Sequence, residues 1–397
     1  MNFVCFLPIN WKNYHRRPHI TALAKYAKVL CVQPPMTLDR FIRNPILAFS
    51  WLFTQKKLYR ESENLYIYAP FALFSYGIAH LFKFPKGLNK SIIARSVERI
   101  LQKLGMKKYV MFVFMPQQDY LLSVLNPTLL CYEVTDAYSA YCGVSNFKNR
   151  QIRRSEIEIL KKADVVIASA NNLYESKKKE NSNCYFVPNA ADVKHFMKAL
   201  DENILIPVDI KQIEGPRIGL IGNINLNIDF GLLKLIAETK PDWSIIIIGA
   251  IVDRRNVYNN KDFNCTVKIK NIHYLGWRSY DLLPNYLKAL DVCLLPYVDN
   301  EYMHYVYPNK LHQYLSGGKP VVSSDMPEIR PYSDVVRIAK NHKDFVRAVE
   351  MALNERGHDF IEKRVKLAQE NSVEVRAQEK MEIITSSLKK KDQIRKL

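Results

Sequence analysis

Short apolar runs rich in β-branched residues alternate with longer amphipathic stretches along most of this chain. The alternation is typical of parallel sheets covered by helices, because strands that are buried on both faces are apolar throughout. In the first half, the pattern predicts strands at residues 3–7, 29–33, 65–69, 109–115, 129–133, 164–169 and 184–187. In the second half, it predicts strands at residues 217–222, 243–249, 272–276, 291–296, 320–324 and 335–338. The fold class expected is α/β.

The alternation lapses between residues 199 and 216, a stretch that contains two prolines and a glycine. A chain of 397 residues exceeds what one core usually organises. We therefore expect two Rossmann-like domains, residues 1–205 and residues 213–370, with a C-terminal helix at 371–397 that joins the first domain. The charged tail after Phe360 is expected to be a solvated helix with a frayed end, with a contact to phosphate-bearing lipid as the alternative. Ligands of such sheets bind at the carboxyl ends of the strands, so function is expected in a central cleft between the domains.

The chain is strongly basic, with 58 Lys and Arg against 39 Asp and Glu and a net charge of +19. Such a charge draws a protein to phosphate-rich surfaces. The sequence has no zinc-ligand spacing, no aromatic RNA-binding pattern and no basic region followed by heptads, so anionic lipid is favoured over nucleic acid. The seven cysteines are scattered and form no C-x-x-C pair, which favours a reducing compartment. We expect a cytoplasmic protein that is peripheral at the inner face of the cell membrane.

Two aromatic stretches in the first half bear on membrane contact. Residues 65–82 contain no charged side chain, but Pro70 and Gly77 interrupt them, which favours a strand followed by an interfacial segment over a membrane span. Residues 44–60 interleave Trp, Phe and Leu with Lys and Arg. They are interpreted as a second interfacial segment, with a hydrophobic cluster under a loop as the alternative.

The most specific segment is residues 308–322, PNKLHQYLSGGKPVV. Pro308 suits the first position of a helix, and the glycines at 317–318 suit its end. The unpaired N–H groups of a first helical turn, with Lys310 beside them, would attract a diphosphate. An ordinary capped helix explains the glycines but not the whole string.

This segment resembles the P-x-K-x-x-E-Y-L-A-x-G-x-P-V-V signature of the glycosyltransferase group 1 family, whose fold is GT-B, with two Rossmann-like domains that face a central cleft. Further similar blocks lie at residues 163–173, 187–196, 272–277, 283–286 and 291–296. The opening residues 11–19 resemble the branch that builds bacterial surface polysaccharides, including the teichuronic acid biosynthesis glycosyltransferases. The resemblance implies transfer of a hexose, with retention, from a nucleotide sugar to a lipid-linked or polysaccharide acceptor in cell-envelope synthesis. It implies no cofactor beyond the nucleotide sugar as co-substrate.

The resemblance also implies a donor site in the second domain. Its expected residues are Gly222, Asn223, Gly249, Trp277, Arg278, Pro308, Asn309, Lys310, Leu311 and Gln313. The sequence departs from the family where Gln313 replaces the Glu that holds the ribose and Tyr305 replaces the Glu eight positions earlier. The family's basic pair after the first strand of this domain is also not evident, which leaves Lys310 as the main cation for the diphosphate.

No D-x-D occurs in the chain, so the carboxylate pair with which many glycosyltransferases hold a cation is missing. His15 and His19 are separated by Pro18, which disturbs their presentation as metal ligands. We therefore predict no metal site. Lys310 is then expected to stabilise the leaving group electrostatically.

Three residues are candidates for the chemistry: Asp136, His15 and Lys310. Asp136 follows a predicted strand and could accept the proton of the incoming hydroxyl, or it could cap a helix. His15 lies just after a strand in a basic turn and could contact a phosphate of the acceptor or of the donor. Its neighbours Asn13, Arg16 and Arg17 are the expected acceptor-binding residues, with a basic surface turn as the alternative.

Three other functions remain open from the sequence. A polyol-phosphate transferase of the same fold would need a His pair in the second domain, and the histidines at 273, 304 and 312 lack that context. A non-catalytic nucleotide- or polysaccharide-binding protein is suggested by Gln313. A nucleic-acid binder would show steeply salt-dependent binding and no affinity for nucleotide sugars.

Overall fold

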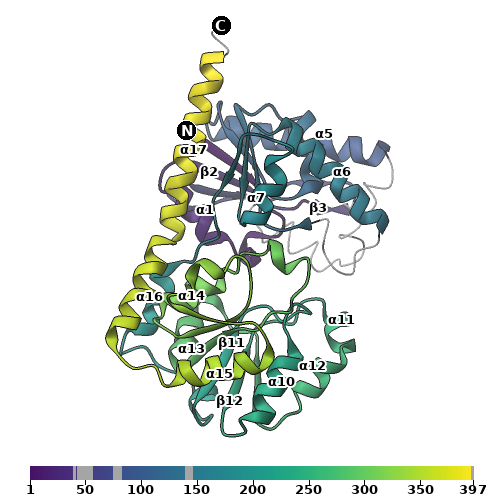
Figure 1. Ribbon diagram of the computed structural model, residues 1–397. Coiled ribbons are helices and arrows are strands. Elements are labelled where there is room, and N and C mark those ends of the chain that lie inside the picture. Colours follow the sequence, from purple (N-terminus) through teal and green to yellow (C-terminus); the bar gives the residue numbers. More distant parts are fainter. Residues whose placement is uncertain (39–41, 43–56, 75–82, 139–145, 395–397) are drawn as a thin grey trace. The chain divides into compact units, whose positions relative to one another are not determined.

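The structure is a computed structural model that describes residues 1–38, 42, 57–74, 83–138 and 146–394 (Figure 1). The chain divides into two compact units, residues 1–188 with 376–397, and residues 189–375. Each unit has its own parallel sheet and its own apolar core. The α/β class predicted from the pattern is confirmed.

The first unit is built on an eight-stranded sheet with the order β10-β9-β8-β7-β1-β2-β5-β4. All neighbouring strands are parallel except β4 and β5. The strands are β1 (Asn2–Phe6), β2 (Lys28–Val32), β4 (Leu58–Ser62), β5 (Leu65–Tyr68), β7 (Val110–Val113), β8 (Leu129–Val134), β9 (Val165–Ala168) and β10 (Cys184–Phe186). A separate two-stranded sheet pairs β3 (Met36–Thr37) with β6 (Phe71–Ala72). Every strand predicted in this half is present; β3, β4 and β6 were not predicted.

Helices cover this sheet because their apolar faces complete its core. The helices of the first unit are α1 (Arg17–Leu23), α5 (Lys83–Lys103), α6 (Asn146–Lys162), α7 (Asn171–Lys178) and most of α17 (Val373–Ile394), with 3-10 turns η1 (Trp11–Asn13) and η2 (Pro116–Ser123). Five cysteines are buried in this protein without disulfide partners, in the part of the chain that the structure describes. Free cysteines are often buried in this way, as small apolar side chains.

The second unit has a six-stranded sheet with the order β13-β12-β11-β14-β15-β16, and all its strands are parallel. The strands are β11 (Arg217–Ile221), β12 (Ser244–Ile248), β13 (Ile272–Gly276), β14 (Val292–Leu295), β15 (Val321–Ser324) and β16 (Val336–Ala339). The helices are α8 (Val193–Phe196), α9 (Val208–Lys211), α10 (Phe230–Thr239), α11 (Arg254–Asn259), α12 (Lys261–Thr266), α13 (Leu283–Ala289), α14 (Lys310–Ser316), α15 (His342–Leu353) and α16 (His358–Glu370). All six predicted strands are present. The order reverses direction at β11, which places the switch point, where ligands of such sheets bind, between β11 and β14.

The boundary between the units lies at residue 188, earlier than the stretch 199–216 expected from the sequence. Polar contacts hold the intervening residues on the second unit. Asn189 donates to the carbonyl of Tyr307 at 3.0 Å, and the His195 ring stacks on Tyr280 with centroids 4.4 Å apart. Lys288 donates to the carbonyls of residues 201 and 202, each at 2.8 Å. The prolines and glycine at 207–216 therefore mark a loop within the second unit.

Helix α17 carries the chain back to the first unit. Ile384 is fully buried in the first core, and Lys391 pairs with Asp164 at 2.6 Å. The expectation of a solvated terminal helix is wrong for α17, because its apolar positions and two of its lysines pack against the first unit.

The aromatic stretches named as interfacial are described only in part. Strand β5 ends at Tyr68, as predicted for the residues before Pro70. Residues 43–56 and 75–82 lie outside the described residues. Among the helices that the structure describes, none is both long and apolar enough to span a bilayer.

Candidate active site

Two glycines touch at the carboxyl ends of β11 and β12. Ile221 pairs with Ile248 in the sheet, so Gly222 and Gly249 follow side by side. Both have positive φ, +153° and +152°, a conformation that side chains other than hydrogen strain. A Cβ atom on Gly249 would lie 1.7 Å from the carbonyl oxygen of Gly222. Only glycine allows the two strand ends to approach this closely.

Lys310 lies directly over Gly222. A Cβ atom added to Gly222 would lie 1.7 Å from Cε and 2.4 Å from Nζ of Lys310. One helical turn later on the same face, the buried Tyr314 hydroxyl accepts from the N–H of Ile221 at 2.8 Å and donates to its carbonyl at 3.2 Å. Tyr314 thereby fixes α14 to the end of β11. The i, i+4 spacing then places the Lys310 ammonium at the switch point of the sheet.

The ammonium of Lys310 is short of negative charge. Burial lowers its pKa below the ordinary value for lysine. No described residue forms an ion pair or a hydrogen bond with it. A half-buried cation without a counter-ion is prepared to bind an anionic group of a ligand.

The rest of the 308–313 segment surrounds this lysine. Helix α14 has only seven residues, and the N–H of Leu311 already donates to the carbonyl of Pro308 at 3.1 Å. Its first turn therefore offers fewer N–H groups than expected, and more of the anion binding rests on Lys310. The Oδ1 atom of Asn309 is buried and accepts no hydrogen bond from the described residues. Gln313 is half-buried, one turn after Asn309.

The two candidate residues after β13, Trp277 and Arg278, differ in how available their side chains are to a ligand. The Trp277 side chain is 67% exposed. Arg278, in contrast, donates to Asp209 and to the Tyr286 hydroxyl, each at 2.6 Å, and its guanidinium lies over the Tyr286 ring. Its pKa is raised, first by the hydrogen bond to Asp209. Arg278 therefore has a structural pairing that its place in the sequence did not suggest. Asn223 is exposed next to Gly222.

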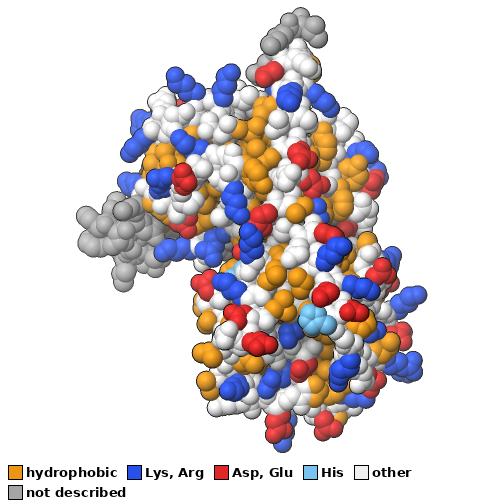
Figure 2. Space-filling view, turned by 90° about the vertical axis from the view of Figure 1, so that its left-hand side faces the viewer, with side chains coloured by type: hydrophobic (Ala, Val, Ile, Leu, Met, Phe, Trp, Pro, Cys, Tyr) orange, Lys and Arg blue, Asp and Glu red, His pale blue; other side chains and the backbone are white. Residues whose placement is uncertain are grey.

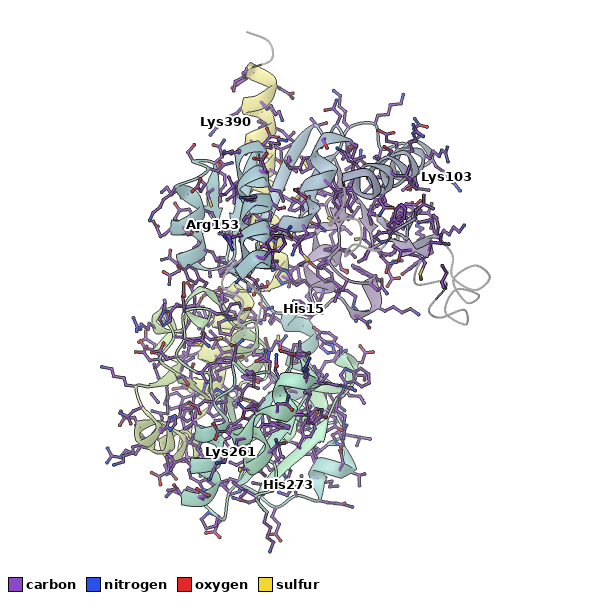
Figure 3. All side chains as sticks on the ribbon, turned by 90° about the vertical axis from the view of Figure 1, so that its right-hand side faces the viewer. His15, Lys103, Arg153, Lys261, His273 and Lys390 are labelled. Carbon is purple, nitrogen blue, oxygen red and sulfur yellow. The ribbon has the colours of Figure 1, made fainter. Side chains whose placement is uncertain are left out.

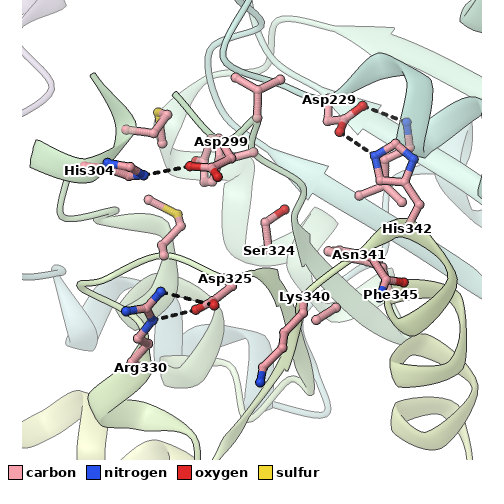
Figure 4. Close-up of a pocket in the computed structure, with 16 residues that line it drawn as sticks. Asp229, Asp299, His304, Ser324, Asp325, Arg330, Lys340, Asn341, His342 and Phe345 are labelled. Carbon is pink, nitrogen blue, oxygen red and sulfur yellow. Dashed lines mark hydrogen bonds and ion pairs between the residues drawn. The ribbon is translucent and has the colours of Figure 1, made fainter. Parts of the chain in front are cut away.

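A polar cavity of about 260 Å³ opens at the carboxyl ends of β14, β15 and β16 (Figure 4). Three acid–base pairs line it: Asp229 with His342 at 2.8 Å, Asp299 with His304 at 2.6 Å, and Asp325 with Arg330 at 2.7 Å. Because each carboxylate faces a cation or an imidazole, the lining offers hydrogen bonds and little net charge. None of these residues was singled out as a site residue from the sequence. The signal was available, since Asp299 and Asp325 follow buried strands at the ligand-binding edge.

In the first unit, Arg16 belongs to a buried ion cluster. Its guanidinium pairs with Glu133 at the end of β8, and Lys380 of α17 donates to the same carboxylate oxygen at 2.8 Å. Arg16 is 5% exposed and Glu133 is 3% exposed. The sequence predicted that Arg16 binds the acceptor. In the structure, its guanidinium forms an ion pair with Glu133 instead.

The opposite charges in this cluster favour the ionised forms of Glu133 and Arg16. Burial by itself raises the pKa of Glu133, but Lys380 and then Arg16 outweigh it and hold the pKa below the ordinary value. Burial likewise opposes the charge of Arg16, and Glu133 raises its pKa. Both pKa shifts favour the charged forms of Glu133 and Arg16, and the cluster ties the β1–α1 loop to α17.

The other first-unit candidates lie around this cluster, at the carboxyl edge of the first sheet. His15 is exposed, and its ring lies 5.7 Å from the buried Tyr14 ring (Figure 3). Asp136 is half-buried just beyond β8, and its charge is one of those that raise the pKa of Arg16. Asn13 is exposed at the end of η1, and Arg17 is half-buried at the start of α1. The structure thus places five predicted residues at one edge of the first unit: Asn13, His15, Arg16, Arg17 and Asp136. Lys310 lies in the second unit.

No group of three His, Cys, Asp or Glu side chains among the described residues is arranged to hold a metal ion.

Comparison with known proteins bears on the second unit first. Residues 215–355 match the family model of glycosyl transferases group 1. The resemblance inferred from residues 308–322 is confirmed. The matched segment contains Gly222, Gly249 and Lys310, so the geometry at the switch point lies within the group 1 region.

A relative in sequence covers more of the chain. The protein of Bacillus subtilis (strain 168) named as a teichuronic acid biosynthesis glycosyltransferase, TuaH, is 26% identical over 244 residues. The match spans 57% of this chain and 59% of that relative.

Solved structures resemble nearly the whole chain. They include an E. coli trehalose-6-phosphate protein bound with UDP-2-fluoro glucose (TM-score 0.68, 11% identity, 98% and 99% of the two chains). Sucrose-phosphate synthase from Thermosynechococcus elongatus gives a TM-score of 0.67 at 11% identity over 97% and 99% of the chains. Anabaena HepE in complex with UDP and glucose gives 0.63 at 12% identity over 96% and 99%. At these identities the likeness shows the fold, which is GT-B.

Proposed function

We propose that this chain is a hexosyltransferase that moves a sugar from a nucleotide-diphosphate donor to a lipid-linked or polysaccharide acceptor in cell-envelope polysaccharide synthesis. The observation that carries the proposal is the half-buried ammonium of Lys310, which has no counter-ion among the described residues and is held over Gly222 by Tyr314 within the segment that matches group 1. Structural neighbours of the same fold bind UDP or a UDP-sugar, which supports a nucleotide sugar as the donor.

In this mechanism the second unit binds the donor. Glycines at 222 and 249 leave room for the diphosphate to approach the backbone, and Lys310 faces it. As the bond between the sugar and the diphosphate breaks, negative charge grows on the leaving group, and a cation already in place stabilises that charge. Trp277 offers an exposed ring for the base, and Gln313 offers an amide for the ribose.

The first unit supplies the acceptor side. Asp136 accepts the proton of the incoming hydroxyl, and His15 contacts a phosphate of the donor or of the acceptor. Asn13 and Arg17 orient the acceptor, and Arg16 acts through Glu133 by holding the loop. By the family resemblance the transfer retains configuration, and by the missing D-x-D it runs without a metal. The same basic chain is proposed to work at the anionic inner face of the cell membrane.

The test is calorimetric titration of the whole chain with UDP, GDP and their common sugars, with and without a chelator. We expect one nucleotide sugar to bind in both conditions and to release its nucleoside diphosphate when a lipid-linked acceptor is added. Tight binding without any release would show a non-catalytic binding protein, and no binding to any nucleotide would refute the proposal.

A further inference from the structure

The polar cavity of the second unit lies on the opposite face of the sheet from Lys310. Leu232 of α10 and Phe345 of α15 line it, and both belong to the core that covers one face of this sheet. Helix α14, which carries Lys310, has none of its described residues in that core. Helices of a doubly wound sheet cover both of its faces. The cavity is therefore a second opening at the carboxyl edge, distinct from the switch point.

Backbone hydrogen bonds fix one wall of this cavity, where the segment after β11 pairs with the segment after β14. The N–H of Asp229 donates to the carbonyl of Pro296 at 2.8 Å. The N–H of Val298 donates to the carbonyl of Asn227 at 3.0 Å. The three acid–base pairs hold the polar side chains around the opening, as Figure 4 shows. Because the walls are formed before any ligand binds, the entropic cost of binding is low.

The cavity has an apolar floor and a polar rim. The floor consists of buried side chains, those of Leu232, Met303, Met326 and Phe345. On the rim, carboxylates alternate with groups that donate hydrogen bonds. A carboxylate can accept several hydrogen bonds at once, so Asp325 can hold Arg330 and a ligand hydroxyl together. Ser324 and Lys340 add donors beside them.

The charges around the cavity are unsuited to an ion. An anion would meet the three carboxylates of the pairs, and a cation would meet Arg330 and Lys340. No three His, Cys, Asp or Glu side chains in the described part of the chain are arranged for a metal ion. The unit adds no net charge, since residues 189–375 contain 24 Lys and Arg and 24 Asp and Glu, and Figure 2 shows both signs mixed over one of its faces. A neutral ligand is favoured.

We propose that this cavity is a carbohydrate-binding site that takes one uncharged sugar ring of a glycan. A sugar ring has an apolar C–H face, which suits the floor, and each of its hydroxyls both donates and accepts, which suits the rim. The volume of about 260 Å³ is below the ~300–1,000 Å³ of pockets for drug-sized ligands, so it fits a single ring better than a whole nucleotide.

The inference rests on the proposed function only for the source of the sugar, since a glycosyltransferase meets sugar rings in its acceptor and its product. The cavity and Lys310 lie on different faces of the sheet. A ring bound in the cavity therefore holds the glycan at a residue other than the one that reacts. Such a site keeps a growing chain on the enzyme between transfers.

The experiment is a saturation-transfer NMR titration of the full chain, with and without UDP. The probes are methyl glycosides of glucose, galactose, N-acetylglucosamine and glucuronic acid, together with maltotriose and chitotriose. The cavity variant carries Asp325→Asn and Arg330→Gln. The control carries Lys234→Gln and Glu238→Gln, an exposed pair on α10 outside the cavity. Both variants keep the net charge, and thermal melting checks that both are folded.

We expect an uncharged glycoside to bind with a roughly millimolar Kd, the range for so small a ligand, and at least one trisaccharide to bind as well. The affinity should fall by about tenfold in the cavity variant and stay unchanged in the control. Equal affinities in the two variants would overturn the proposal. So would a preference for the glucuronide, exclusion of both trisaccharides, or no binding of any glycoside.

The UDP arm separates this site from the donor site. Sugar binding should persist with UDP present and in Lys310→Ala. Loss of sugar binding in both would place the ring in the donor site and contradict the inference. Nucleotide binding is measured on the same samples, so failure of the proposed enzymatic function is distinguished from failure of the carbohydrate site.

Discussion

Among the described residues, each unit has a buried carboxylate that lies between two cations, but the two clusters occupy opposite edges of their sheets. In the first unit, Glu133 binds Arg16 and Lys380 at the carboxyl edge, next to the candidate acceptor residues. In the second, Glu355 binds Arg364 and Arg337 beyond the end of α15, at the amino edge. The second unit thus keeps this buried cluster away from Lys310, whose cation has no counter-ion among the described residues. The first unit builds its ion cluster into the loop that carries His15.

The largest effect is expected from breaking these clusters. Glu133→Gln leaves Arg16 and Lys380 buried without their counter-charge, which should cost about 3–5 kcal/mol of unfolding free energy. Glu355→Gln, the matched change, should also destabilise the protein. Urea unfolding measures the loss of stability in each variant, and nucleotide-sugar turnover, measured where both variants are still folded, separates the two. Turnover should fall in the first variant and persist in the second; equal turnover would contradict the assignment of the first cluster to the site.

The glycines offer the next contrast. Gly249→Ala forces positive φ on alanine and drives a Cβ into the Gly222 carbonyl, which should cost about 1–3 kcal/mol or more. Gly87→Ala lies in α5 with open space around the added Cβ and should stabilise by about 0.5–1 kcal/mol. Thermal melts of both variants check this. A neutral Gly249→Ala would mean that the two strand ends are not held as closely as the structure has them.

Strands were predicted well because they are buried on both faces, as in β12 (Ser244–Ile248), whose four isoleucines are both apolar and β-branched. Long-range pairing was not predictable. Arg16 and Glu133 are 117 residues apart in the chain, and Lys380 lies 247 residues from Glu133. A basic turn and a charged tail give no local sign of a shared carboxylate. The Lys310 turn was predictable because its helix, glycines and strand are contiguous.

Acid should weaken the Glu133 cluster. Its pKa in the folded protein lies below the ordinary value, so the unfolded chain takes up this proton first as the pH falls. The stabilisation is fully present above the unfolded pKa of about 4.3 and is lost as the pH falls through the lower folded value. Unfolding free energies of wild type and Glu133→Gln should therefore converge below about pH 4.3. A constant difference down to pH 2 would show that ionisation of Glu133 is not what stabilises the loop.

Trp277 should give the smallest effect. Because its side chain is exposed, Trp277→Ala should change stability by less than about 0.5 kcal/mol. If its ring stacks on the donor base, the affinity for the nucleotide should fall by about 1 kcal/mol, roughly fivefold. Calorimetric titration measures this. An unchanged affinity would remove Trp277 from the donor site.

The most direct test of the account compares two lysines in the first turns of successive helices, α14 and α15. Lys310→Ala removes the unpaired cation over Gly222, and Lys343→Ala removes an exposed cation from the first turn of α15. We predict that the affinity for the nucleoside diphosphate falls by about 1.5–3 kcal/mol in the first variant, roughly tenfold to a hundredfold, and is unchanged in the second. Wild-type affinity in Lys310→Ala would contradict the central claim that the donor diphosphate is held at this turn.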